Sequence, residues 1–225
     1  MRICVIIPAY NEAKEIAGLI RRITGLGLEV IIIDDGSLDD TAMIAASAGA
    51  NVLRNSSNAG KGAALIKGYS YAVAHGFDAV ISMDGDGQHS CLDIETFIQK
   101  AKTSPAAVIA GNRMAMTKGM PALRVLTNRL MSRLISLITK QYIPDTQCGF
   151  RLIKKEVLAG LDFSTTKYET ESEILIKAAR LGFKIESVPV KTIYSGQKSQ
   201  INPVIDTLRF FRFIILEFLR SFKHA

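Results

Sequence analysis

The sequence is poor in cysteine and contains no long apolar run. Its three cysteines are odd in number and show no CxxC spacing, which argues against a paired disulfide framework and favours a reducing compartment. No window of about 18 uncharged apolar residues is present, so we expect no membrane-spanning helix. The chain opens on the apolar segment of a core strand rather than on a signal peptide. A cytoplasmic protein fits these absences best.

Acidic residues are missing from one long stretch of the chain, between Glu95 and Asp145. The basic residues of this stretch are Lys100, Lys102, Arg113, Lys118, Arg124, Arg129, Arg133 and Lys140, and the whole chain has a formal net charge of +7. Such an asymmetry predicts an anionic partner: phosphate, nucleic acid or a membrane surface. Nucleic acid is not expected, because residues 112–140 contain no Phe, Tyr or Trp on which bases could stack.

Short β-branched runs alternate with helix-like segments along the chain. With 225 residues and 48% hydrophobic content, the chain is long enough to bury one hydrophobic core. The strand-like runs cover 3–8, 29–34, 50–55, 79–84 and 107–111, and the segments between them include the helix-like 12–26 and 60–76. This pattern predicts an α/β fold with a mostly parallel sheet covered by helices on both faces. We expect one domain over 1–200 and a Phe- and Arg-rich tail over 201–225.

Polar residues cluster where four of these runs end. The clusters are Tyr10 to Glu12, Asp34 to Ser37, Asn58 to Gly62 and Asp84 to Gln88. Ligands of open α/β sheets bind beyond the carboxyl ends of the strands. The clusters therefore predict one site at one edge of the sheet.

Asp84 and Asp86 place two carboxylates two residues apart directly after an apolar run. Because Gly85 and Gly87 permit a sharp turn, both can converge on one hard divalent cation, with Gln88 adding a neutral oxygen. A solvated acidic turn is the plainer alternative. A calcium loop is discounted because its sixth position is His89 instead of glycine and a strand precedes it. A phosphatase nucleophile lacks the Lys and paired acids it needs downstream.

The stretch 58–65 reads NAGKGAAL, a glycine-rich turn that opens a helix. Such a turn can hold phosphate on backbone N–H groups, but the GxxxxGK[ST] spacing of a Walker loop is absent. Glycines at such junctions also occur for backbone reasons alone. Lys61 gains importance only beside a metal that also binds phosphate.

The motifs of the chain, in this order and spacing, closely resemble those of family 2 glycosyltransferases with the GT-A fold, and among them the polyprenyl- or dolichyl-phosphate mannose and glucose synthases. The resemblance covers roughly residues 1 to 200 and rests on IPAYNE (7–12), DDGSLDDT (34–41), NAGKGAAL (58–65), DGDGQH (84–89), GNR (111–113), DTQCGFR (145–151), ETESEIL (169–175) and ESVPV (186–190).

This resemblance implies a GDP- or UDP-hexose donor and an inverting, metal-dependent transfer to a polyprenyl phosphate at the cytoplasmic membrane face. The residues that it implies for the nucleoside and diphosphate are Pro8, Ala9, Tyr10, Glu12, Asp35, Lys61 and, through the metal, Asp84. Asp84, Asp86 and Gln88 would hold Mg²⁺ or Mn²⁺. Arg113 and Arg151 are suited to a donor or acceptor phosphate, because a guanidinium offers bidentate donors.

The acceptor decides whether the reaction needs a general base. A lipid monophosphate has its second pKa at about 6 and is already largely dianionic at neutral pH, so no base is required. A sugar or other hydroxyl acceptor needs one, and Asp86, Glu171 and His89 are the candidates. A binding module for nucleotide sugars without catalysis is the alternative from another class.

One stretch departs from the family pattern. Mannose-transferring members usually show an Arg, a glycine and a Ser-Lys pair near the end of the catalytic domain. Residues 193–199 read IYSGQKS here, with no Arg and with the pair reversed. Lys198 is the one candidate to replace the missing charge.

Two stretches have the pattern of amphipathic helices. At about 100° per residue, the leucines of 123–140 and Ile138 share one arc, while Arg129, Arg133 and Lys140 form a basic stripe. In 203–223 apolar residues occupy most of the circumference, interrupted by six charged residues. We expect these stretches to dock on a membrane without spanning it. Packing on the core or in a homodimer is the alternative.

Overall fold

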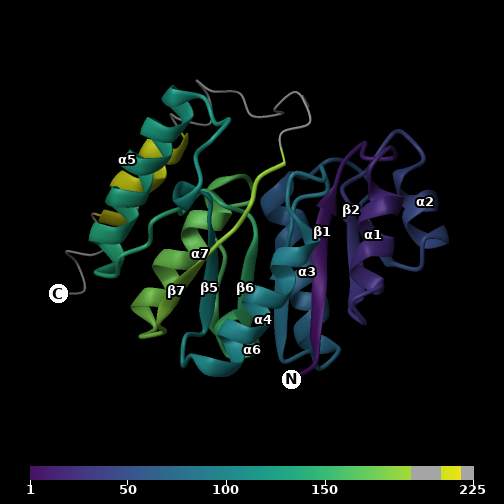
Figure 1. Ribbon diagram of the computed structural model, residues 1–225, viewed down its shortest axis with the longest axis horizontal. Helices are drawn as coiled ribbons and strands as arrows, with labels where there is room; N and C mark the ends of the chain where they lie inside the picture. The colour runs from purple at the N-terminus through teal and green to yellow at the C-terminus, as the bar shows by residue number, and fades with distance from the viewer. Residues whose placement is uncertain (194–208, 219–225) are drawn as a thin grey trace.

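A computed structural model of the protein describes residues 1–193 and 209–218. Its centre is a seven-stranded sheet with the strand order β3-β2-β1-β4-β6-β5-β7 (Figure 1). The strands are β1 (Ile3–Ala9), β2 (Glu29–Asp34), β3 (Asn51–Arg54), β4 (Ala79–Ser82), β5 (Val108–Asn112), β6 (Arg151–Lys154) and β7 (Ile185–Pro189). The predicted α/β fold with a mostly parallel sheet is confirmed.

The sheet is parallel except at β6, which runs antiparallel to both of its neighbours, β4 and β5. Arg151, the first residue of β6, is paired with Ser82, the last residue of β4. The start of β6 therefore lies at the same edge as the carboxyl ends of the parallel strands. This edge gathers the loops on which the site is built.

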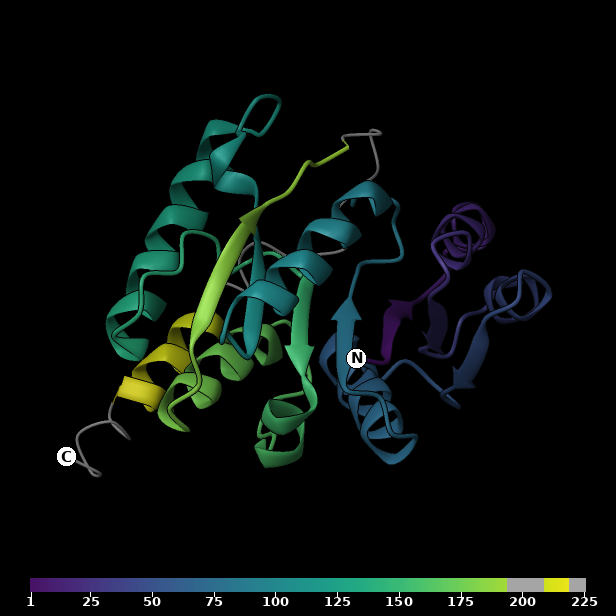
Figure 2. The same cartoon turned by 60° about the horizontal axis from the view of Figure 1, so that its bottom comes forward.

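Helices cover both faces of the sheet (Figures 1 and 2). One face packs against α1 (Ile16–Thr24), α2 (Thr41–Ser47) and α4 (Ile94–Thr103), and the other against α3 (Lys61–Ala74), α5 (Ala122–Thr139), α6 (Lys155–Gly160) and α7 (Glu169–Arg180). Two short 3₁₀ turns, η1 (Cys91–Asp93) and η2 (Arg113–Ala115), follow β4 and β5. Alternate residues of β1 enter the two cores, Val5 and Ile7 on one side and Cys4 and Ile6 on the other, because successive side chains of a strand point to opposite faces.

The described part of the predicted C-terminal helix, residues 209–218, is helical and packs on the rest of the chain. Phe210, Phe213 and Ile214 are buried in the same core as α5 and α7. Glu217 is 1% exposed and forms an ion pair with Arg180 of α7. The remainder of the predicted 203–223 helix, the expected domain boundary at residue 200 and Lys198 lie outside the described residues. Within the described part of the chain, no helix combines the length and the apolar character that crossing a bilayer requires.

Candidate active site

Asp84 stands two residues beyond the end of β4, where the buried strand opens into a turn. Gly87 adopts φ of 71°, which glycine reaches without strain, and a side chain at Gly85 would begin only 3.3 Å from the carbonyl oxygen of Pro8. Asp86 accepts a hydrogen bond of 2.9 Å from the backbone N–H of Gln88. The glycines therefore let the carboxylate turn lie flat against the end of β1.

Lys61, the first residue of α3, joins two carboxylates from different elements. Its Nζ lies 2.5 Å from Asp84 Oδ1 and 2.7 Å from Glu171 Oε1 of α7. Burial alone would lower the pKa of Lys61, but these two carboxylates raise it above its ordinary value, so the ammonium stays charged. A side chain at Gly149 would begin 3.0 Å from both carboxylates, so it would press on this ion-pair cluster and displace its oxygens.

His89 is a second partner of Asp84. Its Nε2 lies 3.3 Å from Asp84 Oδ2, and its ring packs on Phe150 with ring centres 5.0 Å apart. The ring is buried, which places His89 beneath the carboxylate rather than at the solvent side. Burial would raise the pKa of Asp84, but Lys61 and His89 hold it well below its usual range.

Negative charge remains in excess around the turn. Burial and the neighbouring charge of Asp84 raise the pKa of Asp86, and burial together with Asp86 raises the pKa of Glu12 to about 7. Carboxylate and amide oxygens are of the kind that Mg²⁺ or Mn²⁺ prefers, so Asp84, Asp86 and Gln88 stay the predicted ligands. No group of three or more His, Cys, Asp or Glu side chains gathers as a full metal cage among residues 1–193 and 209–218. An ion held here would thus take its other ligands from phosphate and water.

The ends of β1 and β2 form the neighbouring side of the site. Asp35 is buried, and its carboxylate accepts hydrogen bonds from Asn55 Nδ2 (2.8 Å) and from the N–H groups of Ala59 (2.9 Å) and Gly60 (2.7 Å). It thereby holds the loop that delivers Lys61. The Asp35 N–H donates to the carbonyl of Ala9 at 2.9 Å, beside Pro8 and Tyr10. The structure thus brings the residues predicted to bind the nucleoside and diphosphate to one edge of the sheet.

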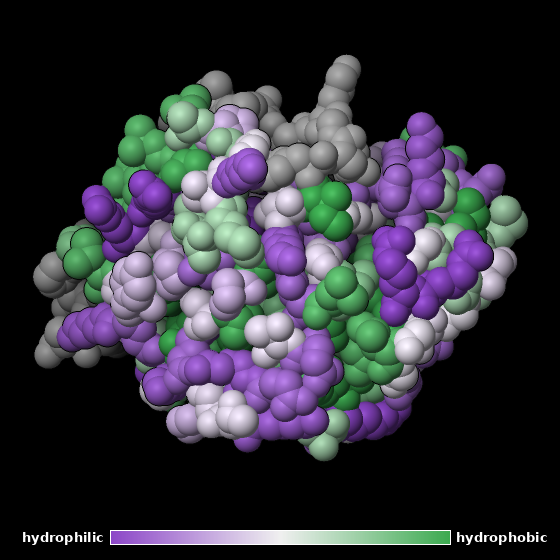
Figure 3. All heavy atoms as spheres, in the orientation of Figure 1, coloured by the Kyte–Doolittle hydropathy of each residue, from purple (hydrophilic) through white to green (hydrophobic). Residues whose placement is uncertain are grey.

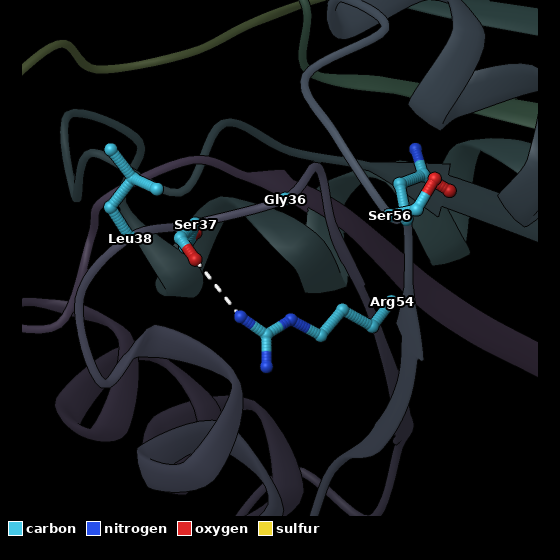
Figure 4. A pocket seen from close by; sticks show the side chains of 6 residues that line it. Gly36, Ser37, Leu38, Arg54 and Ser56 are labelled. Atoms are coloured by element: carbon cyan, nitrogen blue, oxygen red, sulfur yellow. Dashed lines mark hydrogen bonds between the residues drawn. The ribbon is translucent and has the colours of Figure 1, made fainter.

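A hollow opens beside Asp35, at the ends of β2 and β3, and is shown in Figure 4. Its lining consists of Gly36, Ser37, Leu38, Arg54, Asn55 and Ser56. Arg54 reaches across it, donating to the carbonyl of Ser37 at 3.0 Å and pairing with Asp34 at 3.0 Å. The hollow adjoins the site through Asn55, which also contacts Asp35, and does not include Asp84.

The two arginines expected to contact phosphate are held by the protein itself. Arg113 forms a bidentate pair with buried Asp145, with distances of 2.8 and 2.9 Å. Arg151 is 1% exposed, and its guanidinium donates to the backbone carbonyls of Cys148, Thr146 and Glu171. The guanidinium of Arg151 therefore orders the loop around Gly149 in this structure. Its expected contact with a phosphate stays a prediction.

Glu171 is likewise committed, because its carboxylate is paired with Lys61. Glu171 is among the site residues predicted from the sequence. Gly149 and Asp145 are not, although both lie in the motif DTQCGFR. The sequence gives only their positions within the motif. The role of a glycine such as Gly149 becomes visible only when the structure shows which carboxylates lie beside it.

Known proteins share both the sequence pattern and the fold. A family model described as glycosyl transferase family 2 matches residues 4–161. The chain is 31% identical over 240 residues, 96% of each chain, to UDP-N-acetylglucosamine--dolichyl-phosphate N-acetylglucosaminyltransferase of Methanococcus voltae. It is 25% identical over 203 residues, 84% of this chain and 76% of the other, to polyprenol monophosphomannose synthase of Mycolicibacterium smegmatis.

Among solved structures, glucosyl-3-phosphoglycerate synthase from Mycobacterium tuberculosis, in complex with Mn²⁺, UDP and glucosyl-3-phosphoglycerate, superposes with a TM-score of 0.73 at 23% identity. The match covers 97% of this chain and 78% of that one. The sheet order, the strand-end carboxylates and the family match agree: the chain belongs to glycosyl transferase family 2 and has the GT-A fold.

Proposed function

We propose that the protein transfers a hexose from a nucleotide-diphospho-sugar to a polyprenyl phosphate, with Mg²⁺ or Mn²⁺ held by Asp84, Asp86 and Gln88. The observation that carries the proposal is the carboxylate turn beyond β4, set beside the half-buried ammonium of Lys61. Breaking the anomeric C–O bond develops negative charge on the leaving diphosphate. A divalent ion supplies charge stabilisation there, and Lys61 adds a fixed cation in a partly buried site.

A phosphate acceptor is favoured because two of the carboxylates of the site, Asp84 and Glu171, are already engaged. Asp84 and Glu171 are both paired with Lys61, which leaves neither as a ready proton acceptor. His89 is buried beneath Asp84. A dianionic lipid phosphate can attack without a base, whereas a hydroxyl acceptor would depend on Asp86.

The names of the relatives support the same acceptor class, since two of them name a dolichyl-phosphate or polyprenol substrate. The sugars in their names differ, N-acetylglucosamine in one and mannose in the other. The solved structure with Mn²⁺ and UDP supports a divalent ion beside a nucleotide diphosphate. The proposed place of action is the cytoplasmic face of the membrane, where a lipid-linked acceptor is reached from outside the bilayer.

The test is incubation of the protein with Mn²⁺, a short polyprenyl phosphate and labelled GDP-mannose, UDP-glucose or UDP-N-acetylglucosamine, followed by organic extraction. Label in the organic phase supports the proposal, and Asp86→Asn serves as the inactive control. Label on an added sugar or other hydroxyl acceptor instead would identify the alternative transferase. Donor binding without transfer to any acceptor would identify a binding module.

A further inference from the structure

The side of helix α5 that faces the protein carries mostly uncharged polar residues, and the side that carries most of its leucines faces solvent. Asn128, Ser132 and Thr139 are buried together with Ile135. The leucines on the opposite side of the helix are exposed: Leu123 (72%), Leu126 (65%), Leu130 (49%) and Leu137 (75%). At about 100° per residue the two stripes lie roughly half a turn apart, so this orientation is the reverse of that expected for a helix on a water-soluble core.

Hydrogen bonds to the loop that follows α5 fix this orientation. Ser132 Oγ accepts from the N–H of Thr146 at 2.9 Å, and Ser136 Oγ accepts from the N–H of Ile143 at 3.0 Å. These backbone donors lie in an irregular, largely buried segment and need partners. Rotating α5 to bury its leucines would leave them unsatisfied, so the leucine face is committed to the outside.

The helix at 209–218 adds exposed apolar side chains of its own. It shares a core with Ile135 of α5, overlaps the middle of α5 in Figure 1 and lies by the lower end of α5 in Figure 2. Its own outward side chains include Phe211 (39% exposed), Ile215 (58%) and Phe218 (52%). Hydrophobic atoms gather over the upper part of α5 beside strongly hydrophilic side chains in Figure 3.

The charges bordering this face are positive. Arg129, Arg133 and Lys140 are exposed along one side of the leucine stripe, and Arg209 and Arg212 are exposed on the neighbouring helix. The single acid of the 209–218 helix, Glu217, is buried against Arg180. An apolar strip edged by arginines matches the interface of an anionic bilayer, where apolar side chains enter the acyl boundary and cations meet the headgroups.

We propose that the exposed face of α5, extended by the 209–218 helix and termed here the docking face, is the surface on which the protein lies on an anionic lipid bilayer. This inference rests on the proposed function, because a polyprenyl phosphate keeps its hydrocarbon in the bilayer while its phosphate reaches the site. A second copy of the chain is a poorer occupant. A two-fold interface would set the same basic stripe against itself, with no exposed acid on either helix to offset it.

The first test is flotation of the full chain with vesicles of phosphatidylcholine alone or with added phosphatidylglycerol. We expect flotation with the anionic vesicles, release by about 0.5 M salt, and little binding to neutral vesicles. The double variant Leu126→Ser and Leu130→Ser should reduce flotation by at least about tenfold, because it removes two apolar anchors. The matched control, Leu26→Ser and Leu181→Ser, changes two exposed leucines outside the docking face and should float normally.

Activity separates this inference from the proposed function. With a short, water-soluble polyprenyl phosphate the docking-face variant should turn over as the unchanged protein does, whereas with a long acceptor embedded in vesicles it should lose at least about tenfold. No transfer by the unchanged protein in either assay would overturn the proposed function and not the docking face.

Two outcomes would overturn the docking face itself. One is equal flotation, and equal turnover on embedded acceptor, of the docking-face variant and the unchanged protein. The other is a dimer by light scattering that the same variant converts to a monomer, with no flotation of either form, which would assign the face to a second copy of the chain.

Discussion

The two carboxylates of the turn beyond β4 differ in how closely a cation approaches them. Asp84 has Lys61 and His89 as partners, and its pKa lies well below the usual range. Within residues 1–193 and 209–218, Asp86 forms no ion pair of its own, and its pKa is raised by burial and by Asp84. Replacing the two residues should therefore have the same effect on activity and opposite effects on stability.

Asp84→Asn and Asp86→Asn should each lower transfer by at least about a hundredfold, because each removes a charged metal ligand. Without metal, Asp86→Asn should keep or raise the melting temperature, and Asp84→Asn should lower it, since Lys61 and His89 lose a partner. Calorimetry and the extraction assay measure both. Asp78→Asn, at the opposite end of β4, is the control. Near-normal turnover of either site variant in saturating Mn²⁺ would refute the metal assignment.

Arg151→Lys tests whether that residue acts through the loop or on a phosphate. A lysine cannot reach all the carbonyls that the guanidinium bonds, so the free energy of unfolding should fall by about 2–4 kcal/mol. Urea unfolding measures this, with exposed Arg22→Lys expected to change little. An unchanged unfolding midpoint with a raised KM for donor or acceptor would return Arg151 to a phosphate-binding role.

Glu12 should make the stability of the metal-free protein fall as pH rises. Its folded-state pKa of about 7 exceeds the ordinary value of 4.5. Between these two pH values the folded state therefore holds a proton that the unfolded state has released. The resulting stability is present below about pH 4.5 and is lost by about pH 7. Because the side chain is partly exposed, we expect only about 1 kcal/mol.

Glu12→Gln isolates this effect, since glutamine resembles the protonated acid. The variant and the unchanged protein should have equal stability at pH 4.5, and the variant should be the more stable at pH 7.5. Urea titrations at several pH values measure the difference. Parallel pH profiles for the two proteins would show that Glu12 titrates normally.

Among the elements, the parallel strands could be predicted from sequence and the orientation of α5 could not. Continuous apolar runs such as 29–34 are typical of strands buried on both faces, and their polar ends had to meet at one edge. Periodicity in 123–140 identifies which side chains share a face. It does not say which face points inward, because that depends on the N–H groups of Ile143 and Thr146, distant from the pattern itself.

The same limit applies to the site. Asp84, Asp86 and Lys61 follow from strand ends and glycine-rich turns, and the structure brings Asp84 and Lys61 together. Strand β6 was not predicted, because its four residues are too short for a clear period and its direction reverses. Because β6 was not predicted, the sequence could not show that Arg151 lies at the sheet edge that carries the site while its side chain is buried.

Ser132→Ala tests the hydroxyl stripe that orients α5. The change leaves the buried N–H of Thr146 without its partner and should cost about 1–3 kcal/mol of unfolding free energy. Ser132→Thr should recover part of it by keeping a hydroxyl. Thr127→Ala, on an exposed turn of the same helix, is the control for helix propensity. A Ser132→Ala variant as stable as the unchanged protein would mean that the leucine face is not held outward by this bond.

At the scale of the whole molecule, the 209–218 helix belongs to the core that also contains α5 and α7, although it follows the main domain in sequence. Removing residues 201–225 should expose the surface that Phe210, Phe213 and Ile214 cover, costing roughly 4–6 kcal/mol and lowering the melting temperature by roughly 10–20 °C. A chain ending at Phe218 keeps these contacts and is the matched control. Calorimetry of the two truncations decides between a core element and an independent tail.

Equal melting temperatures would mean that the helix contributes nothing to the fold. A large difference would mean that membrane binding must be tested with point variants such as Leu126→Ser, since the shorter chain would lose flotation through unfolding alone.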